Sequence, residues 1–96
     1  MNLTEKQKHH LRSLAHRLKP VVIVGGSGVS DSVLRELDLS LEHHELLKVR
    51  VNASDRDERQ ILIEKLCDRV GAQLVQTIGH VAILYRATKK PSIRLP

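Results

Sequence analysis

The stretch Val21-Val22-Ile23-Val24-Gly25-Gly26-Ser27-Gly28 decides the fold of this chain. A run of β-branched residues is typical of a strand deep in a sheet, and the glycine cluster behind it predicts a tight turn. After the turn, Ser30 can cap a helix that we expect to reach about His43, with an inward side of Val29, Val33, Leu34, Leu37 and Leu41. Strand, turn and helix in this order begin a parallel α/β arrangement.

The segment before this stretch predicts an amphipathic helix. Thr4-Glu5-Lys6-Gln7 has the T-x-x-Q pattern of a capping box, and the helix should run to about Arg17, before Pro20. Its apolar spacing predicts a buried stripe of Leu11, Leu14, Ala15 and Leu18. A second line of the same helix carries positive charge, and we call it the basic rail: Lys8, Arg12, His16 and Lys19.

The remaining elements follow from similar patterns. Residues 46–52 alternate, with Leu47, Val49 and Val51 on one face and Lys48, Arg50 and Asn52 on the other, as in a strand buried on one side. A third helix is expected to open at Ser54 or Asp55, where Asp55-x-x-Glu58 resembles a capping box; it carries Leu62, Ile63, Leu66, Cys67 and Val70 and ends at Gly71. Residues 73–78 and 81–86 read as a hairpin around Gly79-His80.

The predicted fold is α/β in the order α-β-α-β-α-β-β, with three helices and a four-stranded mixed sheet. Helical crossovers make the first strands parallel, and the closing hairpin adds antiparallel pairing. The polar side of residues 46–52 favours two layers over three. We expect one domain over residues 1–96, with residues 88–96 as a loosely ordered basic tail.

Composition narrows the class of protein. With 96 residues, 41% of them apolar and 28% charged, the chain is an ordinary globular domain and is neither disordered nor fibrous. A single cysteine excludes a disulfide framework and a cysteine zinc cluster, and no apolar run is long enough to cross a membrane. These features predict a soluble, cytoplasmic protein.

The charge is distributed unevenly along the chain. The formal net charge is +5, with residues 1–20 and residues 71–96 each contributing +4 and residues 21–47 contributing −4. If the two ends lie near each other, they create a one-sided positive field of the kind that binds nucleic acid or, as a second choice, an anionic membrane surface; the alternative is a basic protein kept soluble by scattered charges. Because Tyr85 is the only aromatic residue, the chain cannot offer an aromatic platform on which several bases stack. We therefore expect contacts to the nucleic-acid backbone.

The glycine cluster has the G-x-x-G spacing by which KH domains clamp a nucleic-acid backbone, carried by Gly25, Gly26, Ser27 and Gly28. It lacks the lysine of a Walker A loop, and Asp31 stands where a dinucleotide-binding pattern needs its last glycine. The pattern therefore argues against a nucleotide cofactor or other small-molecule ligand. A simple tight turn is the alternative interpretation.

Other residue groups give no catalytic or metal site. Adjacent histidines on a helix diverge by about 100°, so His9-His10 and His43-His44 chelate poorly. Cys67 reads as a core residue, and no nucleophile or paired carboxylates have the spacing of an active site. We expect no enzyme activity, no cofactor and no metal. A structural role for His16 stays open beside a phosphate contact.

Several segments in order along the chain resemble the CRM domain (chloroplast RNA splicing and ribosome maturation), in its bacterial stand-alone YhbY-type form. The main match is the segment from Leu18 to Gly28, and shorter matches are Lys6-Gln7-Lys8, Ala15-His16, His44-Glu45-Leu46-Leu47-Lys48-Val49, Gly71-Ala72, Gln76-Thr77-Ile78-Gly79 and Leu84-Tyr85-Arg86. The resemblance implies a fold similar to the C-terminal domain of translation initiation factor three and an association with precursors of the large ribosomal subunit. It also implies RNA contacts through the G-x-x-G loop and the neighbouring basic surface. One departure is that Gly26-Ser27 offers no lysine or asparagine, which relatives often carry there.

Two hypotheses follow from these observations. The first is a monomeric, non-catalytic RNA-binding protein that acts on ribosomal RNA in large-subunit precursors, with the basic rail and the backbone of the glycine bend jointly gripping the sugar-phosphate chain. The second is an interaction adaptor whose basic face docks acidic proteins.

Overall fold

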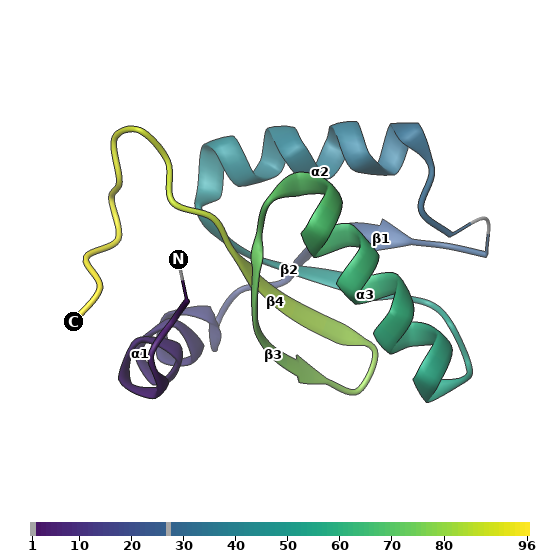
Figure 1. Ribbon diagram of the computed structural model, residues 1–96, viewed down its shortest axis with the longest axis horizontal. Coiled ribbons are helices and arrows are strands. Elements are labelled where there is room, and N and C mark those ends of the chain that lie inside the picture. The colour runs from purple at the N-terminus through teal and green to yellow at the C-terminus, as the bar shows by residue number, and fades with distance from the viewer. Residues whose placement is uncertain (1, 27) are drawn as a thin grey trace.

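The computed structural model describes residues 2–26 and 28–96. Its elements, in chain order, are α1 (Glu5–Ala15), β1 (Pro20–Val24), α2 (Asp31–His44), β2 (Leu46–Val51), α3 (Arg56–Val70), β3 (Gln73–Ile78) and β4 (Val81–Tyr85). The strands form one sheet in the order β1-β2-β4-β3, in which β1 and β2 are parallel and the other pairs are antiparallel (Figure 1). The predicted α/β order and the mixed sheet are confirmed.

The helices begin where the local chemistry predicts, although α1 ends at Ala15, two residues before the expected Arg17. The Thr4 hydroxyl accepts a hydrogen bond from the Gln7 amide at 3.1 Å, and the Gln7 side chain accepts one from the Thr4 amide at 3.0 Å, which completes the capping box of α1. Asp55 caps α3 by accepting from the Glu58 amide. Gly71 ends that helix with a φ of 67°, a left-handed conformation that glycine adopts without steric cost.

The main core lies between the sheet and the pair α2 and α3. The sheet contributes alternate side chains of its strands, among them Val22, Val24, Leu47, Val49 and Leu84, and the helices contribute Leu37, Leu41, Ile63 and Leu66. All are almost completely buried. Removing this much apolar surface from water is the dominant stabilising contribution to the fold.

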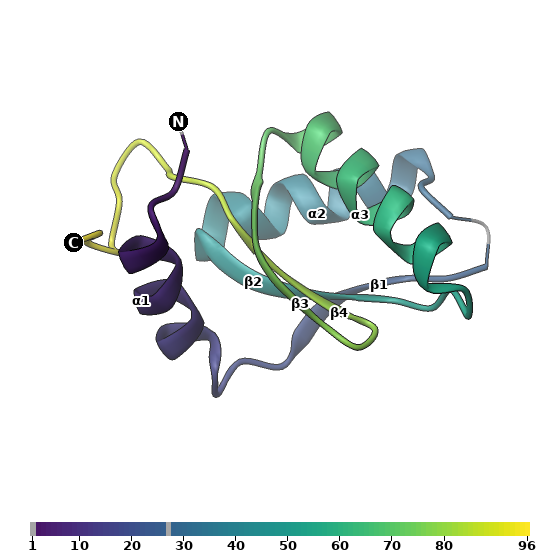
Figure 2. The same ribbon diagram turned by 60° about the horizontal axis from the view of Figure 1, so that its bottom comes forward.

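Helix α1 covers the opposite face of the sheet (Figure 2). Leu11 and Ala15 of α1 pack there with Leu3 against a second cluster of sheet side chains: Leu46, Val75, Ile83 and Tyr85. The expected two layers are therefore wrong, because the polar residues of β2 occupy only the part of this face that α1 leaves uncovered. The predicted stripe of α1 is also only half right: Leu14 and Leu18 are 44% and 39% exposed.

The C-terminal segment lies against α1 and the smaller cluster. Residues 88–96, expected to be a loosely ordered tail, contain no helix or strand, but Ile93 and Leu95 pack on this cluster and Gln7 Nε2 donates to the Pro96 carbonyl at 3.2 Å. Both ends of the chain therefore lie beside α1 (Figure 1). No helix in the described part of the chain is long and apolar enough to span a lipid bilayer.

Candidate nucleic-acid interface

One sheet face is only partly covered, because α1 packs over one end of it. We call the remaining part the open face; its side chains are exposed or half-buried and comprise Val21, Ile23, Lys48, Arg50, Gln76, Ile78 and Val81. These residues alternate along the strands with core residues such as Val22 and Val49, so they point away from α2 and α3. The open face is thus a mixed surface of aliphatic and cationic side chains.

A groove of about 810 Å³ runs between α1 and the open face. Along α1 and the turn after it, the lining side chains recur with helical spacing: His9, Arg12, Ser13, His16 and Arg17. The sheet side of the groove contributes Lys48, Gln76, Ile78 and Ile83. Among the described residues that line it there is no carboxylate, so the charged side chains of its lining are all basic.

Lys48 fixes the connection between α1 and β1. Its ammonium nitrogen donates to the Leu18 carbonyl at 2.9 Å. Because an ammonium group has three donors, this bond leaves further donors of Lys48 for a ligand in the groove. Lys48 therefore ties β2 to the connection after α1 and also adds positive charge to the groove.

The structure divides the predicted basic rail. Arg12 and His16 line the groove, whereas Lys8 lies 3.8 Å from the Glu5 carboxylate in an i,i+3 ion pair, and Lys19 lies in the connection beyond the end of α1. Sequence reasoning did not single out Arg17, Lys48 and Arg50 as candidate interface residues. The available signal was the charge on the polar side of the second strand, which becomes informative once a helix is known to flank that side.

The glycine bend adopts a turn in which one predicted amide is already used. Gly28 has a φ of 71° and its amide donates to the Gly25 carbonyl at 3.0 Å. The backbone of Gly25 and Gly26 is exposed, and a Cβ at either would meet nothing within 4 Å. Ser27, which was also predicted to contact RNA, lies outside the described residues.

A hollow of about 390 Å³ separates the glycine bend from the β2–α3 connection. It is lined by Asn52, Ser54 and Glu58 as well as by the three described glycines of the bend. The Glu58 carboxylate opposes a phosphate in this hollow. The start of α2 is also occupied by its own cap, since the Ser30 hydroxyl accepts from the Val33 amide at 3.2 Å. The bend is therefore a weaker anion site than its sequence pattern suggests.

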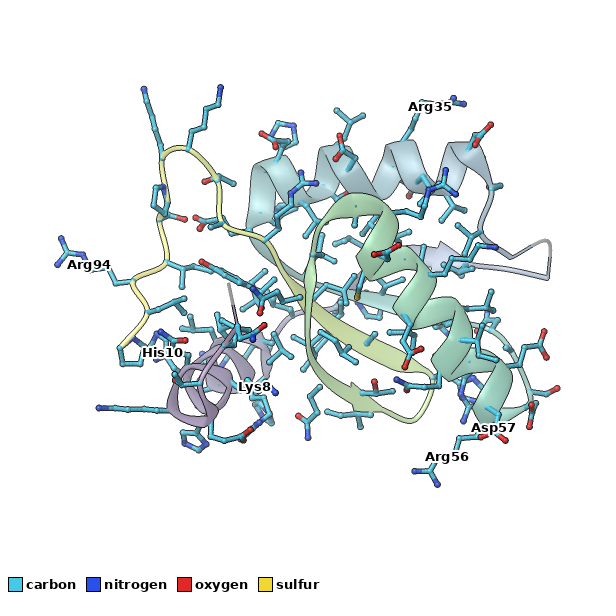
Figure 3. All side chains as sticks on the ribbon, in the orientation of Figure 1. Lys8, His10, Arg35, Arg56, Asp57 and Arg94 are labelled. Carbon is cyan, nitrogen blue, oxygen red and sulfur yellow. The ribbon has the colours of Figure 1, made fainter. Side chains whose placement is uncertain are left out.

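Helix α1 and the glycine bend lie at opposite ends of the molecule's long axis (Figures 1 and 2). Figure 3 shows the side chains in the orientation of Figure 1. Lys8 and His10 lie on α1 at one end, and Arg56 and Asp57 lie at the start of α3, toward the other end. The five residues of β1 between them span about 17 Å at about 3.3 Å per residue. The predicted joint grip therefore requires a sugar-phosphate chain long enough to cross the open face and reach both features.

Within residues 2–26 and 28–96, no three His, Cys, Asp or Glu side chains come together in a way that could hold a metal ion. The cationic groove is consequently the most distinctive chemical feature of the described surface.

Comparison with known proteins places the chain in a family. The model of the CRS1 / YhbY (CRM) domain matches residues 3–86. A protein of Haemophilus influenzae named "RNA-binding protein" is 46% identical over 94 residues, which cover 98% of this chain and 95% of the relative. "Probable RNA-binding protein YqeI" of Bacillus subtilis is 41% identical over 95 residues, 98% of this chain and 99% of the relative.

A solved structure agrees with both matches. The solution structure of a Staphylococcus aureus protein, described as "a putative RNA binding protein", superposes with a TM-score of 0.87 at 38% identity and covers 99% of this chain and 100% of its own. This neighbour has the same fold over its whole length. From the family match over residues 3–86 and these full-length relatives, we conclude that the chain belongs to the CRS1/YhbY (CRM) domain family.

Proposed function

We propose that this protein is a non-catalytic RNA-binding protein that holds the RNA backbone in the groove between α1 and the open face. The observation that carries the proposal is the lining of that groove, in which Arg12, Arg17 and Lys48 meet without an opposing carboxylate among the described lining residues. The names of the relatives as RNA-binding proteins support the same ligand.

The physical basis is the charge of the ligand. A cleft lined by one sign of charge between low-dielectric walls concentrates the field, and phosphate groups that enter it release their counterions. Arginine suits this role because its planar fork of N–H donors matches the geometry of phosphate oxygens. His16 adds a further donor beside Arg12, and the exposed backbone of Gly25 and Gly26 offers a second contact at the far end of β1.

The RNA that we propose is ribosomal RNA in precursors of the large ribosomal subunit, bound by a monomer in the cytoplasm. The CRM resemblance supplies this proposal, since it implies an association with such precursors. No catalytic step is part of it: the protein acts by binding and by shielding phosphate charge.

The test is the salt dependence of RNA affinity in the double variant R12A/R17A. Each lost phosphate contact reduces the slope of log affinity against log salt by about 0.7 for single-stranded RNA, so we expect a reduction of about 1.4 and weaker binding across sequences. The matched control is R35A/K65A, which removes the same charge from α2 and α3; Figure 3 shows Arg35 on the outer side of α2. Equal slopes for the two variants would refute the proposal that the RNA backbone binds in the groove.

The adaptor hypothesis makes a different prediction for the same reagents. An adaptor docks a protein, so it would bind large-subunit precursors but not purified ribosomal RNA freed of protein. We expect the wild-type protein to bind the purified RNA and R12A/R17A to lose that binding. Binding that requires ribosomal proteins would favour the adaptor.

A further inference from the structure

The open face contains a row of side chains that crosses the whole sheet. By strand register, Ile23 pairs with Arg50, Arg50 with Val81, and Val81 with Ile78, so one residue from each of the four strands lies in the row. These four residues point to the same side, because their strand neighbours Val22, Val24, Val49, Val51 and Ala82 are buried in the core under α2 and α3. We call this row the cross-sheet row.

The cross-sheet row is uncovered in the structure. Ile23 and Ile78 are 60% and 58% exposed, and Arg50 is exposed between them. The next row toward α1, which contains Lys48 and Ile83, forms the floor of the groove. The row thus has aliphatic side chains on both sides of a cation. Contact with a flat apolar group that carries a negative charge nearby is favourable for such a surface.

Arg50 is the planar group in this row. Its Nε donates to the Asn52 side-chain oxygen at 2.9 Å, which holds the guanidinium at the end of β2, and Asn52 also lines the hollow beside the glycine bend. The only aromatic residue of the chain, Tyr85, is buried beneath α1 and cannot stack on a ligand. Arginine guanidinium planes stack on unpaired RNA bases in the same way as aromatic rings.

We propose that the cross-sheet row is a platform for the bases of unpaired RNA, with Arg50 stacking on a base and Ile23 and Ile78 packing against its neighbours. This inference rests on the proposed function and adds the ligand class to it. The phosphates of the same strand run along the cations of the groove, Arg12, Arg17 and Lys48. A duplex is a poor ligand for this row, because its bases stack on each other and present their flat faces only at the helix ends.

The occupant follows from charge as well as from shape. An apolar strip alone would suit a protein partner or a second copy of this chain. Here the strip contains Arg50 and borders a groove lined by cations, and the described residues of the open face and of the groove lining include no carboxylate. A second copy would bring the same positive charge to the contact, whereas RNA brings the opposite charge.

The experiment compares an unstructured oligoribonucleotide with an oligomer of the same length whose central nucleotides lack bases. Both carry the same phosphates, so only base contacts distinguish them. We expect wild-type protein to bind the base-containing oligomer at least about fivefold more tightly, the lower bound for one stacked base. We also expect it to prefer that oligomer over a blunt duplex with the same number of nucleotides.

Two variants locate the base contacts. R50K keeps the charge but removes the planar group, so its salt slope should match that of the wild type while the preference for bases falls. I23S/I78S removes exposed aliphatic surface and should also lose the preference. The matched control is L39S/I61S, whose side chains are 62% and 63% exposed on α2 and α3, and it should keep the preference.

Each outcome bears on the proposal. Equal binding of the two oligomers by the wild type, or an unchanged preference in both variants, overturns the platform; the groove still stands if R12A/R17A weakens binding. A dimer of the free protein that I23S/I78S dissociates would assign the face to a second copy and overturn it as well. Absence of any RNA binding refutes both the proposed function and this inference.

Discussion

Oε1 of Glu45 accepts hydrogen bonds from the amide nitrogen of Ser92 at 2.5 Å and from its hydroxyl at 2.7 Å. Glu45 also ends α2 with a φ of 56°, and its carbonyl accepts from the Arg86 amide at 2.8 Å. Its carboxylate is buried. One residue therefore joins the end of α2, the end of β4 and the C-terminal segment.

The Glu45 contact makes stability depend on pH. Burial acts to raise the pKa of Glu45, but the hydrogen bonds from Ser92 and from the backbone of Ile93 outweigh it, so the pKa lies below its ordinary value. The stabilisation is fully present above the ordinary glutamate pKa of about 4.3 and is lost as the pH falls through the lower pKa of the folded protein. Urea unfolding as a function of pH measures it.

The variant E45Q tests this dependence. At neutral pH we expect E45Q to lower the free energy of unfolding by about 2 kcal/mol, because the glutamine amide cannot form the charged hydrogen bonds and its nitrogen becomes a buried donor. The difference from the wild type should shrink in acid, where Glu45 is protonated in the wild type. A difference that stays constant from neutral to strongly acidic pH would contradict the assignment. S92A, which removes only the hydroxyl, should give a smaller loss with the same pH trend.

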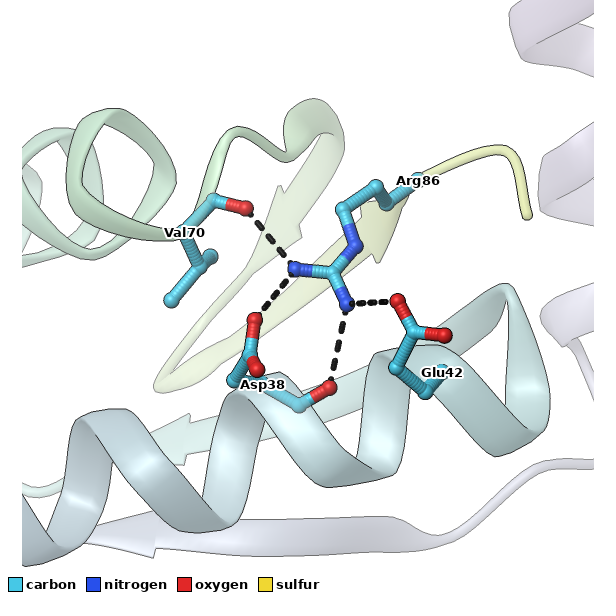
Figure 4. A network of polar contacts seen from close by, with 4 residues as sticks. All are labelled: Asp38, Glu42, Val70 and Arg86. Atoms are coloured by element: carbon cyan, nitrogen blue, oxygen red, sulfur yellow. Dashed lines mark hydrogen bonds and ion pairs between the residues drawn. The ribbon is translucent and has the colours of Figure 1, made fainter. Parts of the chain in front are cut away.

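Arg86 ties three elements together (Figure 4). Nη1 donates to Asp38 Oδ1 at 2.7 Å and to the Val70 carbonyl at 2.9 Å, and Nη2 donates to the Asp38 carbonyl and to Glu42 Oε1, both at 3.0 Å. The guanidinium is mostly buried, although both carboxylates are more than half exposed, which weakens each ion pair.

We expect R86K to lower the free energy of unfolding by about 2 kcal/mol, because lysine cannot form this set of forked hydrogen bonds and leaves the Val70 carbonyl without its donor. Chemical denaturation measures the change. R69A, which removes an exposed cation from the last turn of α3, serves as the control and should change stability by less than about 0.5 kcal/mol. An effect of R86K no larger than that of R69A would show that the Arg86 hydrogen bonds do not stabilise the fold.

The glycines of the bend should separate into structural and ligand-contacting positions. G28A is expected to cost about 1 kcal/mol of stability, because the φ of 71° strains any other residue even though its Cβ would meet only Leu62 Cδ2 at 3.8 Å. G25A should slightly raise stability, since a Cβ there has open space and alanine restricts the unfolded chain. If the bend contacts RNA, G25A weakens affinity without a fall in melting temperature; unaltered affinity would remove the bend from the proposed interface.

Cys67 should be unreactive in the folded protein. Burial, together with the nearby Glu64 carboxylate, raises the pKa of the Cys67 thiol to about 11, so the thiolate is scarce at neutral pH. We expect alkylation by iodoacetamide at least about a hundredfold slower than that of an ordinary thiol with a pKa of about 8.5. The same reaction in urea should proceed at the ordinary rate. Fast labelling of the folded chain would contradict the raised pKa.

Local signals in the sequence predicted the elements of the fold well. The caps at Thr4 and Asp55 and the glycine at position 71 act through residues only a few positions apart, so their hydrogen bonds can be predicted without the tertiary structure. The face covered by α1 could not be predicted in this way. Leu11 and Leu14 follow the same apolar spacing, yet the first is buried and the second lines the groove.

The candidate groove could be predicted only in part, for a similar reason. Arg12 and His16 could be found because they share a helix line, whereas Lys48 lines the groove because tertiary packing brings β2 beside α1, where Lys48 also donates to the Leu18 carbonyl, thirty positions earlier in the chain. Of the two interpretations of the G-x-x-G pattern, the tight turn agrees with the local hydrogen bond from the Gly28 amide to the Gly25 carbonyl, whereas the approach of Glu58 from α3 depends on tertiary packing. Spacing identifies candidate residues, and packing decides which of them meet.

The two apolar clusters on opposite faces of the sheet are unequal, and this has a thermodynamic consequence. The smaller cluster holds α1 and the C-terminal segment, so these parts can detach in a partial unfolding step while α2, α3 and the sheet stay folded. The amides of α1 should then exchange with deuterium before those of β2. A ligand that bridges α1 and the sheet would suppress this partial unfolding. Bound RNA should therefore slow hydrogen exchange most at the amides of α1 and least at the amides that already exchange slowest in the free protein.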